Sequence, residues 1–133
     1  MKGQEALDRG LNLPERVVVV EVGLRDGLQN EPVTVPTAAK LSLFRLLRNA
    51  GVSHFEITSF VHPALVPQLA DAEETARQAL AFPGCHLAAL VPNEKGYERA
   101  AAAGLREVVF VLSASESHNR RNVGCGVEES LAR

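Results

Sequence analysis

The sequence of 133 residues contains few cysteines and no long apolar run. Its two cysteines, Cys85 and Cys125, stand far apart, with no other cysteine near either. This spacing excludes a disulfide framework or a zinc knuckle and fits a reducing compartment, which we expect to be the cytoplasm. We expect Cys85 to be a small buried residue of a strand. Cys125 lies between two glycines, which predicts an accessible loop position.

A charge excess of one sign is also missing. Lys and Arg number 14 and Asp and Glu number 16, which gives a formal net charge of −2. This balance gives no electrostatic reason to expect nucleic acid or an anionic membrane surface as a partner. No apolar run approaches the roughly 20 residues that cross a bilayer. We interpret residues 1–15 as a polar lead-in without the apolar stretch of a secretory signal, followed by one domain over residues 16–133.

The chain does contain an alternation of strand and helix patterns from residue 16 onward. The continuous apolar run in residues 16–23 is typical of a strand that is buried on both faces of a parallel sheet. The next segment repeats apolar residues at the spacing of one helical face. We predict strands over residues 16–23, 54–60, 86–91 and 107–112, and helices over residues 37–50, 68–80 and 94–103 and from about residue 127.

Four βα units in this order predict an α/β fold with parallel strands and helical crossovers. The average repeat of about 30 residues matches that of a (β/α)8 TIM barrel of roughly 250 residues. We therefore expect half of such a barrel, with about four βα units. An open, doubly wound sheet is the alternative. No glycine-rich phosphate motif follows the first strand, because Gly23 and Gly27 do not have the required spacing.

Polar residues gather after the predicted strands, whereas the helix-to-strand turns are short and mostly apolar or glycine. Because the carboxyl ends of barrel strands carry the active site, this asymmetry predicts one functional face. The polar segments after the four strands are residues 25–31, residues 58–62, Asn93 and residues 113–121.

Two carboxylates, Glu21 and Glu56, lie inside predicted strands, where a charge is costly unless it is paired. Glu21, Gly23 and Arg25 are spaced by two and share one face if the strand persists, so Arg25 is a candidate partner for Glu21 or Glu56. Such a pair could hold the barrel mouth together, aim the guanidinium at a substrate oxygen, or both. Asp26 is either an oxygen ligand for a divalent metal or an ordinary turn residue.

Residues 21–31, Glu-Val-Gly-Leu-Arg-Asp-Gly-Leu-Gln-Asn-Glu, resemble the opening motif of the hydroxymethylglutaryl-CoA lyases. That family belongs to a barrel superfamily with an Arg-Asp-Gly-x-Gln element, which also includes isopropylmalate and homocitrate synthases and biotin-dependent carboxyltransferases. Leu28, Asn30 and Glu31 are closer to the lyase branch than to the synthases. The resemblance continues in residues 55–61, 91–96, 114–116 and 122–130, and so extends from about residue 17 to the end.

The resemblance implies cleavage of a 3-hydroxy-3-methylglutaryl-CoA-type thioester to acetyl-CoA and acetoacetate, as in leucine degradation. The implied cofactor is Mg2+ or Mn2+, acting as Lewis acid and template. The implied partners are an acyl-CoA thioester and further copies of the chain in a homo-oligomer. By matching position, the resemblance implies catalytic roles for Arg25 and Glu56, a metal-ligand role for Asp26, substrate-binding roles for Gln29, Ser59 and Asn93, and a supporting role for Glu21.

The family's other metal ligands are a His-x-His pair and an Asn from the second half of the barrel, and its catalytic Cys lies in a later glycine-rich loop. The four histidines of this chain form no such pair, so we interpret each as a surface or packing residue: His54, His62, His86 and His118. We do not assign Cys125 as the catalytic Cys. We therefore expect the chain to be incomplete for catalysis on its own. A related acyl-CoA synthase or carboxyltransferase is one alternative, and a non-catalytic half-barrel that self-associates is another.

Overall fold

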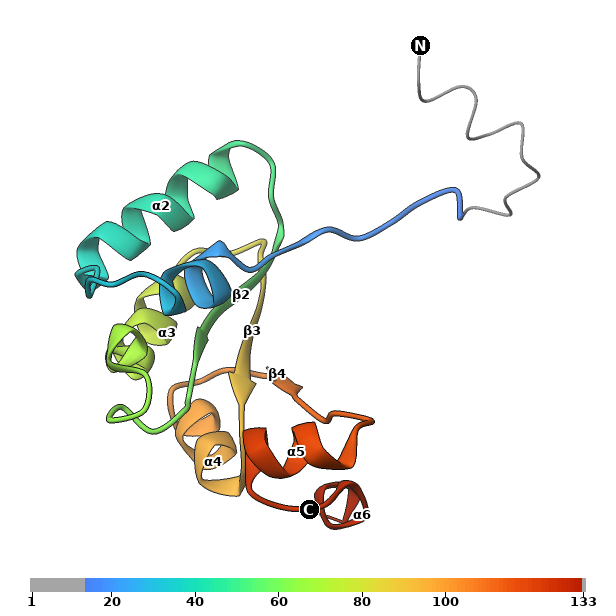
Figure 1. Ribbon diagram of the computed structural model, residues 1–133. Helices are drawn as coiled ribbons and strands as arrows, with labels where there is room; N and C mark the ends of the chain where they lie inside the picture. The colour runs from blue at the N-terminus through green and yellow to red at the C-terminus, as the bar shows by residue number, and fades with distance from the viewer. Residues whose placement is uncertain (1–13, 133) are drawn as a thin grey trace.

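Four parallel strands form one sheet in the order β1-β2-β3-β4 in the computed structural model, which describes residues 14–132 (Figure 1). The lead-in expected for residues 1–15 therefore lies outside the described residues, apart from its last two. The strands are β1 (Val20–Glu21), β2 (His54–Ser59), β3 (His86–Val91) and β4 (Glu107–Phe110). Each strand pairs in parallel with the next one along the chain.

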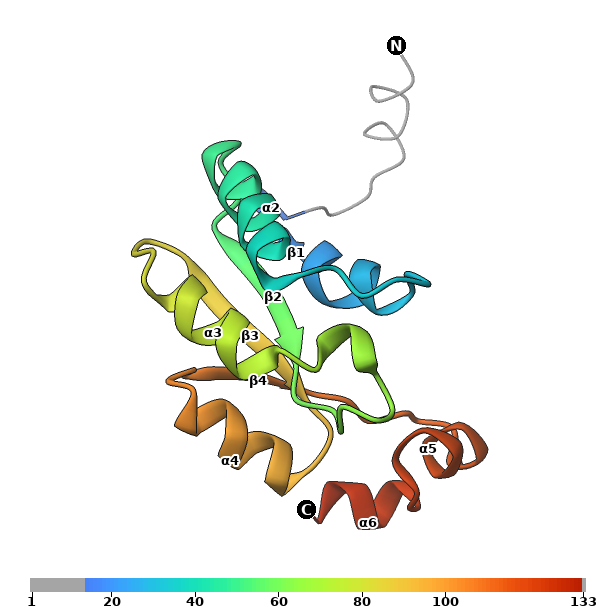
Figure 2. The ribbon, with the colours of Figure 1, turned by 90° about the vertical axis from the view of Figure 1, so that its left-hand side faces the viewer.

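Three crossover helices, α2 (Thr37–Asn49), α3 (Ala72–Leu80) and α4 (Glu94–Ala102), connect these strands. All three cover the same face of the sheet (Figure 2). Crossovers of one hand that always advance by one strand keep their helices on one side, whereas a doubly wound sheet reverses its strand order and carries helices on both faces. The order therefore confirms half of a (β/α)8 barrel and excludes the doubly wound alternative.

The core lies between this face of the sheet and the helices. The Phe44 ring of α2 packs edge-on against Phe55 of β2, with 4.8 Å between the ring centroids, and both residues are 1% exposed. Helices α3 and α4 bury mostly alanine and glycine. A Cβ atom added at Gly96 would lie 2.8 Å from Pro92 Cδ and 3.1 Å from the Phe60 carbonyl oxygen. Small residues thus let α4 approach the sheet closely.

The first strand is shorter and less buried than predicted. Its pairing is limited to Val20 and Glu21, and the chain then enters a π-helical turn, η1 (Gly23–Gly27). Residues 17–19 are all valine with exposed fractions of 67–74%, so the predicted burial on both faces is wrong for them. A β-branched run favours extended backbone, but burial requires neighbouring layers. Among residues 14–132, β2 is the strand that pairs with β1.

Most other boundaries lie within two residues of the predicted ones, but two segments differ. The helix predicted over residues 68–80 is divided into η2 (Pro67–Leu69) and α3. The polar segment 113–121 contains an unpredicted helix, α5 (Glu116–Val123), followed by α6 (Val127–Leu131). Helix α5 has no apolar stripe; Ser115 caps it by accepting a hydrogen bond from His118 N at 3.4 Å, as is typical of an N-cap. None of the helices in residues 14–132 has the length and apolar character of a transmembrane segment.

Neither cysteine lies quite as predicted. Cys85 is partly buried and directly precedes β3 rather than lying within it. Cys125 is 3% exposed, with its Sγ 3.1 Å from Ser130 Oγ. The Asn119 amide donates to both Cys125 O and Ser130 Oγ, at 3.0 Å and 2.7 Å. The flanking glycines predicted the loop, but not the polar cluster that buries the thiol.

Candidate functional site

The chain turns sharply where β1 ends at the carboxyl edge of the sheet. The Val22 carbonyl oxygen accepts hydrogen bonds from the backbone N–H groups of Arg25 at 3.0 Å and Asp26 at 2.7 Å. Leu24 anchors the turn, because it is 1% exposed and belongs to the hydrophobic core. This single turn brings the Arg25 and Asp26 side chains to the end of the neighbouring strand.

Arg25 pairs with Glu56 rather than with Glu21. Arg25 Nε donates to Glu56 Oε1, and Arg25 Nη1 donates to Asp26 Oδ1 at 2.8 Å. The side chains of Arg25 and Glu56 are 17% and 7% exposed, so the pair is largely shielded from water. Glu21 Oε1 instead accepts from Gly23 N at 2.6 Å. The common face of Glu21, Gly23 and Arg25 was expected only if the strand persisted, and this condition is not met, because β1 ends at Glu21.

A bulge in β2 places Glu56 and Ser59 on the same face of the sheet. The pairing register with β3 shifts between them, so that Glu56 lies beside Ala88 and Ser59 lies beside Leu90. Residues two apart in a regular strand share a face, and the two β3 partners are two apart. Bulges often re-aim side chains next to functional sites. Ser59 is fully buried, and its Oγ accepts from Val61 N at 3.3 Å.

A hollow of about 630 Å3 opens at this edge of the sheet. Three predicted site residues, Arg25, Gln29 and Asn93, line it. Asn93 also caps α4, where its Oδ1 accepts from Gly96 N at 3.0 Å, and this bond fixes the side chain. Glu56 is not a lining residue, but it forms an ion pair with Arg25, which is one. The rest of the lining comes from Val61, His62, Leu65, Val66, Leu90, Pro92, Val111, Asn122 and Val123.

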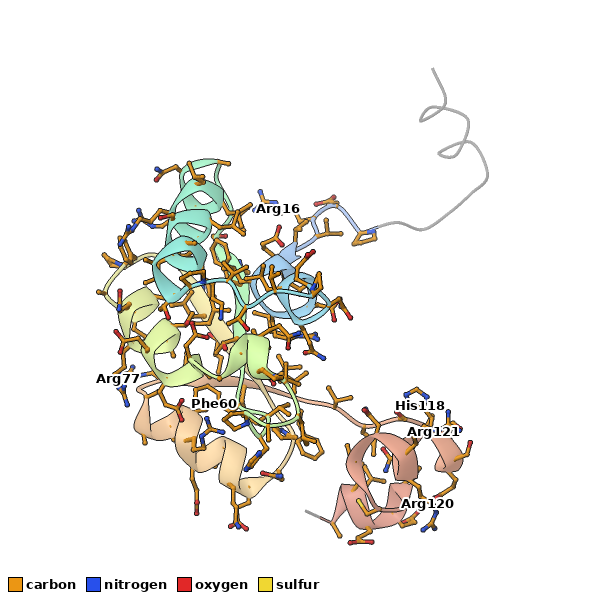
Figure 3. The ribbon with its side chains drawn as sticks, turned by 60° about the vertical axis from the view of Figure 1, so that its left-hand side comes forward. Arg16, Phe60, Arg77, His118, Arg120 and Arg121 are labelled. Atoms are coloured by element: carbon orange, nitrogen blue, oxygen red, sulfur yellow. The ribbon has the colours of Figure 1, made fainter. Side chains whose placement is uncertain are left out.

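Two polar residues of this lining, His62 and Asn122, have no site role in the sequence-based prediction. His62 follows β2 at the predicted functional edge, so its position alone would have justified including it. Asn122 lies in the last turn of α5, which the sequence did not reveal. His118, Arg120 and Arg121, on the same helix, are exposed and are not part of the lining (Figure 3).

Asp26 is the candidate metal ligand, but the described residues do not complete a metal site. Its side chain is 56% exposed, and its Oδ1 accepts from Arg25. Within residues 14–132, no group of three or more His, Cys, Asp or Glu could hold a metal ion. Mg2+ requires about six oxygen ligands in near-octahedral geometry. His54 and His86 do stack, with 4.2 Å between ring centroids, but they begin β2 and β3 at the opposite edge of the sheet.

Comparisons with known proteins give matches that extend over most of the chain. A profile of the HMGL-like family matches residues 16–133. The mitochondrial hydroxymethylglutaryl-CoA lyase of Rattus norvegicus is 50% identical over 121 residues, which cover 91% of this chain and 37% of the rat protein. The solved HMG-CoA lyase of Bacillus subtilis superposes with a TM-score of 0.84 at 45% identity, covering 92% of this chain and 41% of that chain.

The HMG-CoA lyase of Acinetobacter baumannii, solved in complex with coenzyme A and 3-methylmalate, superposes with a TM-score of 0.81 at 42% identity. That match covers 86% of this chain and 38% of the other. The chain thus spans about two fifths of the length of the relatives it matches. Because the family profile covers residues 16–133 and the backbone superposes on solved members, the chain belongs to the HMGL-like family.

Proposed function

We propose that this chain carries part of the active site of a carbon–carbon lyase that cleaves a 3-hydroxy-3-methylglutaryl-CoA-type thioester to acetyl-CoA and acetoacetate. The observation that carries the proposal is the Arg25 guanidinium, which lines the hollow while bonded to Glu56 and Asp26. The names of the relatives and the coenzyme A complex of one of them support the substrate class. A cytoplasmic homo-oligomer acting in leucine degradation belongs to the same proposal.

Arg25 has the properties that such a cleavage requires. When the bond between carbons 2 and 3 of the thioester breaks, the hydroxyl group on carbon 3 releases its proton and becomes the keto group of acetoacetate. The electron pair of the broken bond moves toward the thioester carbonyl, and negative charge develops on that oxygen until carbon 2 takes up a proton to give acetyl-CoA. A guanidinium already held in place stabilises this charge most where it is largest, along the reaction path. Glu56 fixes the guanidinium by accepting a hydrogen bond from Arg25 Nε, so little reorganisation is needed as the charge forms.

The other candidate residues have supporting roles in this proposal. Gln29 and Asn93 line the hollow with Arg25 and present amide groups to a bound substrate. Ser59 is buried and is not among the lining residues; its Oγ accepts a hydrogen bond from Val61 N, so it sets the start of the following loop. Glu21 fixes the turn before Arg25 through Gly23 N.

Asp26 would contribute one carboxylate to a Mg2+ or Mn2+ site that residues 14–132 do not complete. When bound, such an ion would act as a Lewis acid toward substrate oxygen atoms. The exposed side chain of Asp26 lies beside Arg25, so the carboxylate and the guanidinium would act on the same substrate.

A chimera tests this proposal directly. Residues 16–132 would replace the matching segment of the Bacillus subtilis lyase, on which the chain superposes with a TM-score of 0.84. We expect the chimera to release acetoacetate from 3-hydroxy-3-methylglutaryl-CoA in the presence of Mg2+. Arg25→Gln in the chimera is expected to lower kcat by a factor of about 10²–10³, as loss of a preorganised charge-stabilising donor does.

The matched control is Arg106→Gln, an exposed arginine in the turn before β4 at the opposite edge of the sheet. We expect this variant to keep the activity of the chimera. A folded chimera without lyase activity would contradict the proposal, as would an Arg25→Gln variant that retains it. Thioester condensation by the chimera in place of cleavage would favour the synthase alternative.

A further inference from the structure

The segment that joins β2 to α3, residues 60–71, forms one wall of the hollow. Four of its residues, Val61, His62, Leu65 and Val66, belong to the lining, as do Arg25 and Gln29 of the β1–α2 connection. The segment starts at Phe60, whose backbone N donates to Leu90 O at 2.8 Å. Two cationic side chains from neighbouring helices, Lys40 and Arg99, contact this segment, one near each of its ends. Neither side chain lines the hollow.

Lys40 of α2 contacts the C-terminal end of this wall. Its exposed fraction is 2%, which is unusual for lysine. The ammonium group donates to the Gln68 carbonyl oxygen at 2.6 Å and to the Asp71 carboxylate. Asp71 Oδ2 also accepts from Thr37 Oγ1 at 2.6 Å. A buried charge persists only where its hydrogen bonds are satisfied, and these partners tie the start of α2 to the start of α3.

The region around Lys40 also links the β1–α2 connection to the β2–α3 connection, and both connections line the hollow. Gln68 Nε2 donates to the Glu31 carbonyl oxygen at 2.9 Å. Glu31 closes the motif that contains Arg25, Asp26 and Gln29. The Lys40 cluster therefore couples the wall to the connection that carries the candidate catalytic side chains.

Arg99 of α4 contacts the N-terminal end of the wall. Its Nη1 donates to the carbonyl oxygens of Phe60 at 3.3 Å and Val61 at 3.4 Å, and its Nε donates to Glu73 at 2.7 Å. The guanidinium also lies 5.4 Å from the centroid of the Phe60 ring, which faces α4 (Figure 3). One side chain thus connects α4, α3 and the first two residues after Ser59.

We propose that Lys40 and Arg99 are positioning residues that keep residues 60–71 as a fixed wall of the hollow rather than a mobile lid. Neither side chain lines the hollow, so both act through their contacts to the wall: Lys40 with Gln68 O and Asp71, and Arg99 with the carbonyls of Phe60 and Val61 and the Phe60 ring. The consequence for catalysis rests on the proposed function, but the rigidity of the wall can be measured without any substrate.

The test is amide hydrogen exchange, followed by mass spectrometry, on the 133-residue chain. Lys40→Met keeps most of the apolar stem and removes the charge. We expect it to speed exchange in residues 61–70 by about tenfold or more, through local opening, while residues 86–91 of β3 stay protected. The matched control is Lys95→Met, an exposed lysine of α4, which should leave both segments unchanged.

The double variant Lys40→Met with Asp71→Asn separates positioning from general stability. It leaves neither charge buried without its partner, so we expect the urea midpoint to return toward that of the parent chain. Exchange in residues 61–70 should nevertheless stay fast, because the bond to the Gln68 carbonyl is still missing. Slow exchange in the double variant would overturn the proposal, as would equal acceleration in β3.

Two milder variants keep the proposal testable if Lys40→Met does not fold. Gln68→Ala removes the link to Glu31 and should speed exchange in residues 28–36. Arg99→Lys keeps the charge but cannot span Glu73 and both carbonyls, so it should loosen residues 60–64. Unchanged exchange in both variants would refute the proposal. These rates do not depend on the activity of the chimera, so a failure of the lyase proposal is recognised separately.

Discussion

Arg25 has two carboxylate partners that differ greatly in their surroundings. Glu56 comes from the neighbouring strand and is 7% exposed, whereas Asp26 is the next residue in the chain and is 56% exposed. A shielded partner holds the guanidinium in one orientation, because little water competes for the bond. An exposed partner adds little stability but remains accessible to solvent and ligands. The two carboxylates thus suit different tasks, support of the arginine and contact with a ligand.

This difference predicts unequal effects on stability. Glu56→Gln leaves a shielded guanidinium without its main partner, and we expect it to lower the free energy of unfolding by about 2–3 kcal/mol. Asp26→Asn should lower it by less than about 1 kcal/mol, because the pair is exposed. Urea unfolding of the 133-residue chain measures both values. Equal losses in the two variants would show that Glu56 does not bear the larger share of the interaction.

At the scale of elements, the pair between α3 and α4 should respond to acid. The hydrogen bond from Arg99 lowers the pKa of Glu73 below its ordinary value of 4.5. A carboxyl group with a lowered pKa in the folded state stabilises the fold fully above its unfolded pKa, and this stabilisation is lost as the pH falls through the folded pKa. We expect Glu73→Gln to be less stable than the parent chain near neutral pH, with the two urea midpoints converging at acid pH.

The control for this prediction is Glu74→Gln, one position along the same helix, where the side chain bonds to Gln78 rather than to an arginine. Its urea midpoints should follow those of the parent chain across the same pH range. A gap between Glu73→Gln and the parent that stays constant into acid would mean that the ion pair is not its cause.

The elements that could be predicted were those whose pattern matches their burial. The apolar stripe that includes Leu47 predicts α2, and β3 has its predicted bounds. The valine run of residues 17–19 is misleading, because β-branched residues favour extended backbone whether or not a layer covers them. Helix α5 has no apolar stripe, since its buried residue is a polar one, Asn119. Capping and tertiary hydrogen bonds form this helix, and periodicity does not report them.

At the scale of the molecule, the sequence predicts which residues share an edge but not how they meet. Strand order and the polar segments after each strand bring Arg25, Gln29 and Asn93 to one hollow. The pairing of Arg25 with Glu56 instead of Glu21 depends on the η1 turn, and the common face of Glu56 and Ser59 depends on the β2 bulge. Both are local irregularities of the backbone, a five-residue π-helical turn and a strand bulge, and no spacing rule encodes them.

The donor set of the edge also predicts weak metal binding by the chain alone. One exposed carboxylate, already bonded to an arginine, cannot replace much of the hydration shell of Mg2+ or Mn2+, because these ions need several oxygen ligands at once. We expect calorimetric titration of the 133-residue chain with Mn2+ to give a Kd weaker than about 1 mM, with no change in Asp26→Asn. In the chimera, Mn2+ should bind more tightly, and Asp26→Asn should weaken that binding by about tenfold or more, because loss of even an outer-shell partner of a metal ligand costs about 10- to 100-fold in affinity. Tight one-to-one binding by the 133-residue chain would mean that it completes a metal site without ligands from elsewhere.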